Sequence, residues 1–113
     1  MRVIAAPNAF KGSLDAVDAA EAMKKGILAA MPRCKAVCVP VADGGDGLVE
    51  VMLHGMGGQR VEVPVSGPRM DRVTAPFCLV PERGLAVVEM ARASGLALLP
   101  PSQQDPTRTT TLG

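Results

Sequence analysis

The amino-acid sequence predicts an α/β fold that begins with a parallel sheet and continues into antiparallel strands. Over the first sixty residues, short β-branched runs alternate with stretches of helical periodicity, which is the pattern of strand–helix–strand units with right-handed crossovers. Beyond residue 60, three strand-like runs follow one another with only short turns between them. A chain of 113 residues is long enough to bury a core of its own.

The first unit is expected to be a strand followed by a helix. Residues 3–6 are a short apolar run that is typical of a buried strand. Ser13 is the expected N-cap of the helix, and Asp15 in its first turn suits the positive end of the helix dipole. Apolar side chains then recur at helical spacing until Pro32 ends the helix.

The second unit repeats this order. Residues 36–41 form the next strand, with Pro40 marking the end of its pairing. Asp46 is expected to cap a helix over residues 47–56, which Gly57 closes.

The second half of the chain predicts an antiparallel meander. Its strands are expected at residues 60–65, 73–80 and 85–88. We place a boundary near Val65, so that residues 1–64 belong to a first structural region and residues 65–113 to a second.

Composition excludes several function classes. Twelve basic and eleven acidic residues leave a net charge of +1, and no Trp or Tyr is present, so we expect no nucleic-acid partner. No apolar stretch approaches twenty residues, and no signal peptide precedes the first strand, so we expect no membrane span. Three scattered cysteines and one histidine predict neither a zinc site nor a disulfide framework, and indicate reduced thiols in a cytoplasmic protein.

The loop "NAFKGSL" after the first strand is a candidate anion site. Lys11 supplies a positive charge, Gly12 allows close approach of the backbone, and Ser13 opens a helix whose free N–H groups favour an anion. The order Lys-Gly-Ser is not that of a P-loop. The alternative is a plain turn, in which Gly12 makes the bend and Lys11 is only solvated.

The loop "ADGGDGL" after the second strand is a candidate metal or base site. Asp43 and Asp46 lie three residues apart among glycines, and two carboxylates at a strand end suit Mg²⁺ or general-base chemistry. The structural alternative places Asp43 in the turn and leaves Asp46 as a helix cap.

Two further candidates lie toward the end of the chain. Glu89 follows an apolar run directly, so it is either paired with Arg92 one helical turn away or placed for a substrate. The threonine run at 109–111 is suited to cap a helix or to donate hydroxyls to an anion.

Four segments together resemble the glycerate kinase type I family. They are "APNAFKGSL", "VPVADGGDGL", "VVEMARASGLALLP" and "PTRTTTLG", and they occur in this order across essentially the whole chain. The resemblance implies an enzyme that transfers the γ-phosphoryl group of ATP to D-glycerate with Mg²⁺, giving 2-phosphoglycerate. It also implies two α/β domains, one Rossmann- or flavodoxin-like and the other inserted within it.

The resemblance has departures. Many family members carry Asp-Ser where this chain has Asn8-Ala9, so a carboxylate role does not carry over to that position, and Asp46 stands where relatives often have Glu. Family members are also much longer, so the chain looks like an amino-terminal portion, and we expect these 113 residues alone to be inactive.

The resemblance and the loops together assign candidate site residues. Lys11, Asp43 and Asp46 are the expected catalytic residues, and the two aspartates are the expected Mg²⁺ ligands. The expected substrate-binding residues are Asn8, Lys11, Gly12, Ser13, Gly44, Gly45, Glu89, Ser94 and Thr110. The alternatives are a non-catalytic nucleotide- or anion-binding module, and an inactive structural fragment that self-associates.

Overall fold

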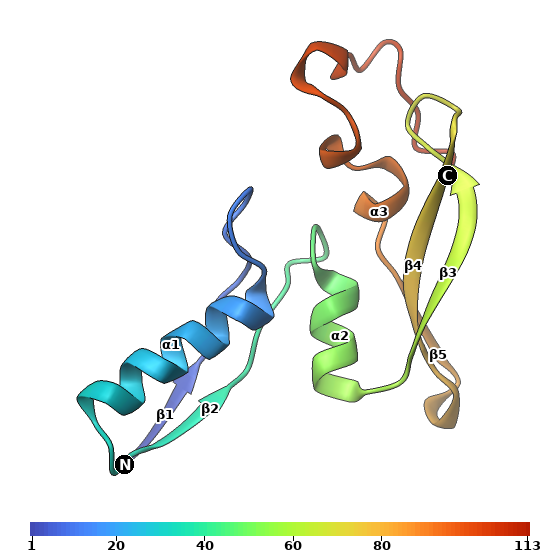
Figure 1. The fold of residues 1–113 in the computed structure, drawn as a ribbon. Helices are drawn as coiled ribbons and strands as arrows, with labels where there is room; N and C mark the ends of the chain where they lie inside the picture. The colour runs from blue at the N-terminus through green and yellow to red at the C-terminus, as the bar shows by residue number, and fades with distance from the viewer.

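The computed structural model describes residues 1–113 and begins with the predicted parallel unit (Figure 1). Strand β1 (Arg2–Ala5), helix α1 (Ala16–Ala30) and strand β2 (Lys35–Cys38) follow in order. The two strands are parallel, with Arg2 opposite Lys35 and Ala5 opposite Cys38. Strand β2 ends earlier than expected, although backbone bonds from Val39 to Ala5 and from Val41 to Pro7 keep the departing chains side by side.

Helix α1 begins with a different cap from the expected one. The Asp15 side chain accepts a hydrogen bond from the Asp18 N–H at 2.8 Å, whereas Ser13 lies in the preceding turn. The prediction of Ser13 as N-cap is therefore wrong, because Asp15 occupies the extended residue from which the helix starts. Alanines at 16, 19 and 20 form the buried part of the helix, and their small side chains let it lie close to β1 and β2.

The predicted antiparallel meander is present. Strands β3 (Gln59–Ser66), β4 (Arg72–Val80) and β5 (Leu85–Val88) form one sheet in that order. A short 3₁₀ turn (Pro81–Arg83) and Gly84, whose φ of 59° is left-handed, join β4 to β5. The antiparallel pairing of three strands with short connections confirms the prediction from the sequence.

Helix α2 (Leu48–Met56) packs on the meander and not on the parallel pair. Val49, Cys78 and Val80 form its buried core, with contributions from partly buried side chains of α2 and β5. The expected boundary between residues 64 and 65 falls inside β3, which pairs with β4 along its whole length. The periodicity of α2 indicated a buried face but not which sheet would cover it.

The remaining elements are short. Helix α3 (Ala91–Ser94) follows β5, and two 3₁₀ turns (Leu96–Leu98 and Pro101–Gln103) lead to the end of the chain. No helix is long and apolar enough to cross a membrane.

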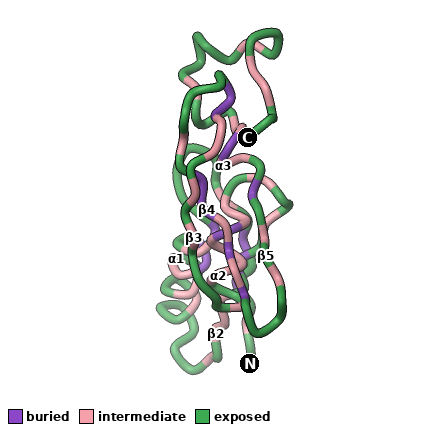
Figure 2. Tube along the Cα trace, turned by 90° about the vertical axis from the view of Figure 1, so that its right-hand side faces the viewer, coloured by how far each residue is buried: buried purple, intermediate pink, exposed green.

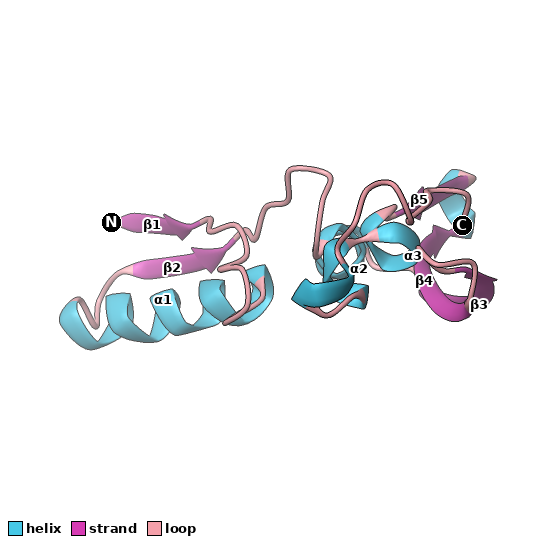
Figure 3. Cartoon of the chain, turned by 90° about the horizontal axis from the view of Figure 1, so that it is seen from above, coloured by secondary structure: helices cyan, strands magenta, loops and turns pink.

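The chain forms an open, thin arrangement. Viewed from above, β1, β2 and α1 lie at one end, and α2 with the meander lies at the other (Figure 3). The molecule measures 54 × 38 × 16 Å, and its radius of gyration of 16.9 Å exceeds the roughly 13 Å of a compact domain of this length. Only 15 residues are buried, and most of the chain is exposed or intermediate (Figure 2). Large apolar side chains, such as Ile4 of β1 and Val88 of β5, are therefore exposed to solvent.

Candidate functional site

The two candidate loops lie at the same place in the structure, as expected for loops that leave the carboxyl ends of neighbouring parallel strands. Two adjoining pockets of about 640 and 220 Å³ lie between them, and we call these the loop pockets. Lys11 and Asp46 line both. The other predicted residues that line one or the other are Asn8, Gly12, Ser13, Asp43 and Gly45.

The first loop is a tight bend with Lys11 at its tip. Phe10 and Leu14 exchange backbone hydrogen bonds of 2.8 and 3.1 Å. These bonds close the loop at its base, so residues 11–13 form the tip of the bend. Gly12 has a φ of 74°, a left-handed conformation that favours glycine. Lys11 is exposed and makes no ion pair, so its charge is available to a ligand.

The backbone amides of this loop offer less to an anion than the sequence suggested. The Ser13 N–H donates to the Phe10 carbonyl at 2.9 Å, and the Asp15 carboxylate already occupies the N-terminus of α1. The Asn8 side-chain oxygen accepts from the Ala9 N–H at 2.7 Å, which leaves its amide nitrogen free to donate. An anion in the loop pockets would therefore depend mainly on the Lys11 ammonium group.

The second loop presents two carboxylates. Asp43 Oδ1 accepts from the Gly45 N–H at 3.1 Å, which orders the turn around Gly44, where φ is 97°. Asp46 is exposed and lines both loop pockets. No group of three or more His, Cys, Asp or Glu side chains is arranged to hold a metal ion. Two carboxylates nevertheless fit Mg²⁺, which completes its shell with water and substrate phosphates.

Asp46 does not cap α2, contrary to prediction. The N-cap is Gly47, whose φ of 90° is left-handed, and no side chain of the loop bonds to the start of the helix. The N–H groups of Gly47 and Val49 donate instead to the two carboxylate oxygens of Glu89, at 3.1 and 3.0 Å. The cap comes from a residue forty positions away, a contact that local sequence patterns do not show.

The Glu89 carboxylate is consequently buried, and the structure does not expose it to a substrate as the sequence suggested. The residue is 1% exposed, and its two oxygens accept from Gly47 and Val49 at the start of α2. Arg92 Nε lies 3.2 Å from Glu89 Oε1, an ion pair whose geometry falls short of a hydrogen bond. The pairing of Glu89 with Arg92, which the sequence left as the alternative to a substrate role, is thus present.

Glu50 and Arg92 extend the site beyond the residues that sequence reasoning identified. Both line the larger loop pocket, and a terminal nitrogen of Arg92 lies 3.8 Å from Glu50 Oε1. Arg60 also pairs with Glu50 and, at 3.2 Å, with Glu62; these acceptors raise the pKa of the Arg60 guanidinium. Lys11 and Arg92 therefore share the loop pockets with four carboxylates, those of Asp15, Asp43, Asp46 and Glu50. Sequence reasoning considered Arg92 only as a partner of Glu89 and missed Glu50.

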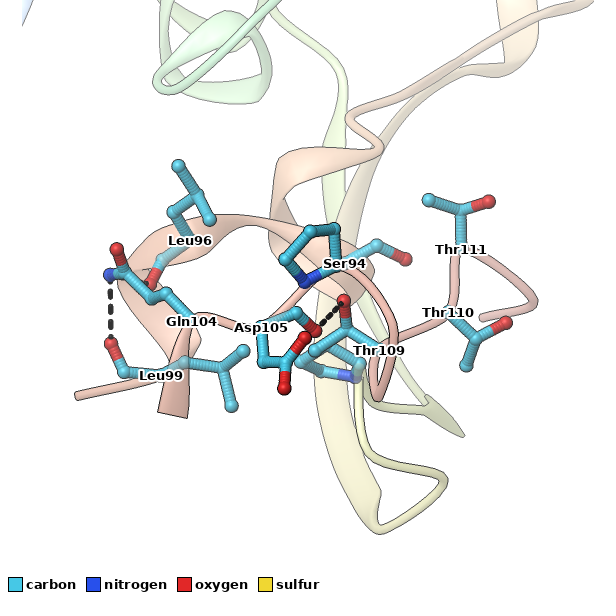
Figure 4. Close-up of a pocket in the computed structure, with 10 residues that line it drawn as sticks. Ser94, Leu96, Leu99, Gln104, Asp105, Thr109, Thr110 and Thr111 are labelled. Atoms are coloured by element: carbon cyan, nitrogen blue, oxygen red, sulfur yellow. Dashed lines mark hydrogen bonds between the residues drawn. The ribbon is translucent and has the colours of Figure 1, made fainter. Parts of the chain in front are cut away.

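Ser94 and Thr110 lie elsewhere. They line a separate pocket of about 500 Å³ between α3 and the last residues (Figure 4). The Thr110 N–H donates to the Pro68 carbonyl at 2.9 Å, and the Thr109 hydroxyl donates to the Asp105 carbonyl at 3.0 Å. Neither Ser94 nor Thr110 lines the loop pockets, although Leu96 borders both their pocket and the smaller loop pocket.

Comparison with known proteins gives a consistent result over the whole chain. The model of the glycerate kinase family matches residues 3–113. The glycerate kinase of Bacillus subtilis is 42% identical over 113 residues, which are 100% of this chain and 30% of that protein. The glycerate 2-kinase of Escherichia coli is 40% identical over 113 residues, again 100% of this chain and 30% of that protein.

A solved structure agrees with these relatives. The crystal structure of a provisionally assigned glycerate kinase 2 from Salmonella typhimurium LT2 superimposes with a TM-score of 0.76 at 40% sequence identity. The match covers 98% of this chain and 30% of that one. The chain thus spans about 30% of the length of the curated relatives that it matches.

Proposed function

Since the chain belongs to the glycerate kinase family, we propose that it is the amino-terminal part of an enzyme that transfers the γ-phosphoryl group of ATP to D-glycerate. The expected product is 2-phosphoglycerate. The single observation that supports a catalytic role for these residues is the convergence of both candidate loops on the loop pockets. Lys11 of the first loop and Asp43 and Asp46 of the second line these pockets, and phosphoryl transfer is achieved mostly by positioning and charge neutralisation.

Lys11 is proposed to bind an anionic group, either a phosphate of ATP or the carboxylate of glycerate. It lies at the tip of a bend, is exposed, and has no competing carboxylate partner. Asn8, whose side-chain amide is free, and Ser13, whose hydroxyl is exposed, are proposed as further hydrogen-bond donors, because Asn8 lines the smaller loop pocket and Ser13 the larger.

Asp43 and Asp46 are proposed to hold Mg²⁺ or to orient the attacking hydroxyl group. A bound Mg²⁺ supplies neutralisation of the charge on the phosphates. Gly44 and Gly45 allow the turn that presents the two carboxylates, because Gly44 is left-handed and Gly45 donates its N–H to Asp43.

We further propose that two structural units meet at these pockets. The unit of β1, α1 and β2 begins a Rossmann- or flavodoxin-like domain. The packing of α2 on β4 and β5 supports a boundary in the loop before Leu48 as an alternative to the one expected near Val65.

A coupled assay of ADP formation tests the proposed reaction, on the complete gene product that carries residues 1–113. We expect ADP formation to depend on ATP, Mg²⁺ and D-glycerate together. Lys11→Ala should lower kcat/KM by about 100-fold, the usual effect of losing one charge-stabilising contact in a transition state. Lys25→Ala is the matched control, because Lys25 is an exposed lysine of α1 outside the loop pockets.

Two outcomes would contradict the proposal. Binding of ATP without any glycerate-dependent turnover would favour the non-catalytic anion-binding module. Wild-type kinetics in Lys11→Ala would remove the anion role of this residue while leaving the family assignment intact.

A further inference from the structure

Glu89 is the one charged residue among the fully buried side chains, and its position is unusual. It directly follows β5, yet its carboxylate reaches the start of α2, forty residues earlier in the chain. Burial of a carboxylate is unfavourable unless hydrogen bonds and opposite charge replace its water. Glu89 has both, because two N–H groups and the Arg92 guanidinium surround it.

Helix α2 has no cap of its own, which explains the need for this contact. Gly47 at its N-cap position has no side chain, and the first N–H groups of a helix require an acceptor. A carboxylate at this end is also favoured by the helix dipole. Glu89 therefore joins the second loop to the end of β5 through one buried group.

The joined loop is the one that carries the proposed catalytic aspartates. Gly47 follows Asp46 directly, and the loop has three glycines and few other restraints: the bond from Gly45 to Asp43, and a long bond of 3.3 Å from Leu48 to Gly45. The bond from Gly47 to Glu89 is thus the restraint closest to Asp46 that comes from another element.

Glu89 also contacts Arg92, a residue that lines the larger loop pocket. It pairs with Arg92, and Arg92 reaches toward Glu50 on α2, so that Arg92 and Glu50 both face the larger loop pocket. One buried carboxylate therefore sets the backbone next to Asp46 and the direction of the Arg92 side chain.

We propose that Glu89 is a positioning residue for phosphoryl transfer: it touches no substrate, and it holds the Asp43–Asp46 loop and Arg92 in the geometry that the reaction requires. This inference rests on the proposed function, because positioning matters only if the loop takes part in the chemistry. A purely structural cap would lower stability without changing turnover of the folded protein.

The test compares Glu89→Gln and Glu89→Asp with Glu82→Gln in the complete gene product. Glutamine keeps the volume but offers one acceptor oxygen to two donors, and aspartate keeps the charge on a shorter side chain. Glu82 is an exposed carboxylate in the turn between β4 and β5, without an ion pair, and serves as the control. Turnover is measured well below the unfolding midpoint of each variant, so that only folded protein is compared.

We expect Glu89→Gln to lower kcat by about 10- to 100-fold, since small misplacements of catalytic groups have effects of this size. KM for ATP should change less than kcat. Hydrogen–deuterium exchange of peptides covering residues 43–49 should accelerate in the same variant, and Glu82→Gln should change neither measurement. Glu89→Asp should fall between wild type and Glu89→Gln in both, and it replaces Glu89→Gln if that variant does not fold.

The outcomes separate the two ideas. Absence of glycerate-dependent turnover in the wild type would overturn the proposed function and this inference together. An active wild type with unchanged kcat in the folded variants, but faster exchange at residues 43–49, would overturn the positioning role alone. Unchanged exchange would show that Glu89 does not hold the loop.

Discussion

Replacement of Val49 by alanine tests the packing of α2 on the antiparallel sheet. Val49 is fully buried and contacts Cys78 and Val80 of β4, so its truncation removes core contacts between the two elements. Losing the equivalent of two buried methylene groups costs about 1.6 kcal/mol at about 0.8 kcal/mol each. A residual cavity of roughly 50 Å³ would add about 1.2 kcal/mol at about 24 cal/mol per Å³. We therefore expect a loss of about 2–3 kcal/mol in the free energy of unfolding.

Urea unfolding followed by circular dichroism measures this loss, with Val88→Ala as the matched control. Val88 is also a valine of this unit, but it is 72% exposed, so its truncation should cost less than about 0.5 kcal/mol. The slope of free energy against urea should stay the same in both variants. Equal losses for the two valines, or a loss below about 1 kcal/mol for Val49→Ala, would refute the packing of α2 described here.

Three further predictions concern the parallel unit. Asp15→Ala should lower the free energy of unfolding by about 1 kcal/mol, because it removes the N-cap of α1. Ser13→Ala should change the same quantity by less than about 0.5 kcal/mol. Urea unfolding measures both, and a larger loss for Ser13→Ala would indicate that Ser13 is the cap. Gly26→Ala should stabilise the protein by about 0.5–1 kcal/mol, because the position is helical and an added methyl group meets no atom within 4 Å; a lower thermal midpoint would contradict this. Partial burial and the neighbouring Glu21 carboxylate raise the pKa of the Cys38 thiol, so its thiolate fraction at pH 8 is small. Alkylation of Cys38 by iodoacetamide should therefore still accelerate above pH 9, because only the thiolate reacts. A plateau of the alkylation rate below pH 8.5 would contradict the shift.

The elements of the fold were largely predictable from local patterns. The parallel pair, helices α1 and α2 and the three-stranded meander follow from apolar periodicity and turn residues, which depend on neighbours along the chain. The same reasoning predicted that the loops of Lys11 and Asp43 lie at one edge of the sheet, because the carboxyl ends of neighbouring parallel strands lie side by side. Where two residues offered the same local chemistry, as Ser13 and Asp15 did, sequence alone did not decide between them.

The parts that were not predictable depend on contacts between distant residues. The role of Glu89 at the start of α2 joins positions 47 and 89, and no local pattern records such a contact. Gly47, in a left-handed conformation, is the N-cap of α2. Asp46 therefore does not cap the helix and instead lines the loop pockets. The choice of the sheet that covers α2 likewise depends on contacts with Cys78 and Val80, which are distant in the sequence.

The distant cap of α2 has a consequence for the order of folding. A helix of nine residues is too short to persist by itself in water, and α2 gains both its packing surface and its N-terminal acceptor from residues after position 70. During synthesis, α2 therefore gains its N-terminal acceptor only after Glu89 has emerged from the ribosome. The helix and the meander should form in one cooperative step, with α1 and the first strands able to assemble earlier.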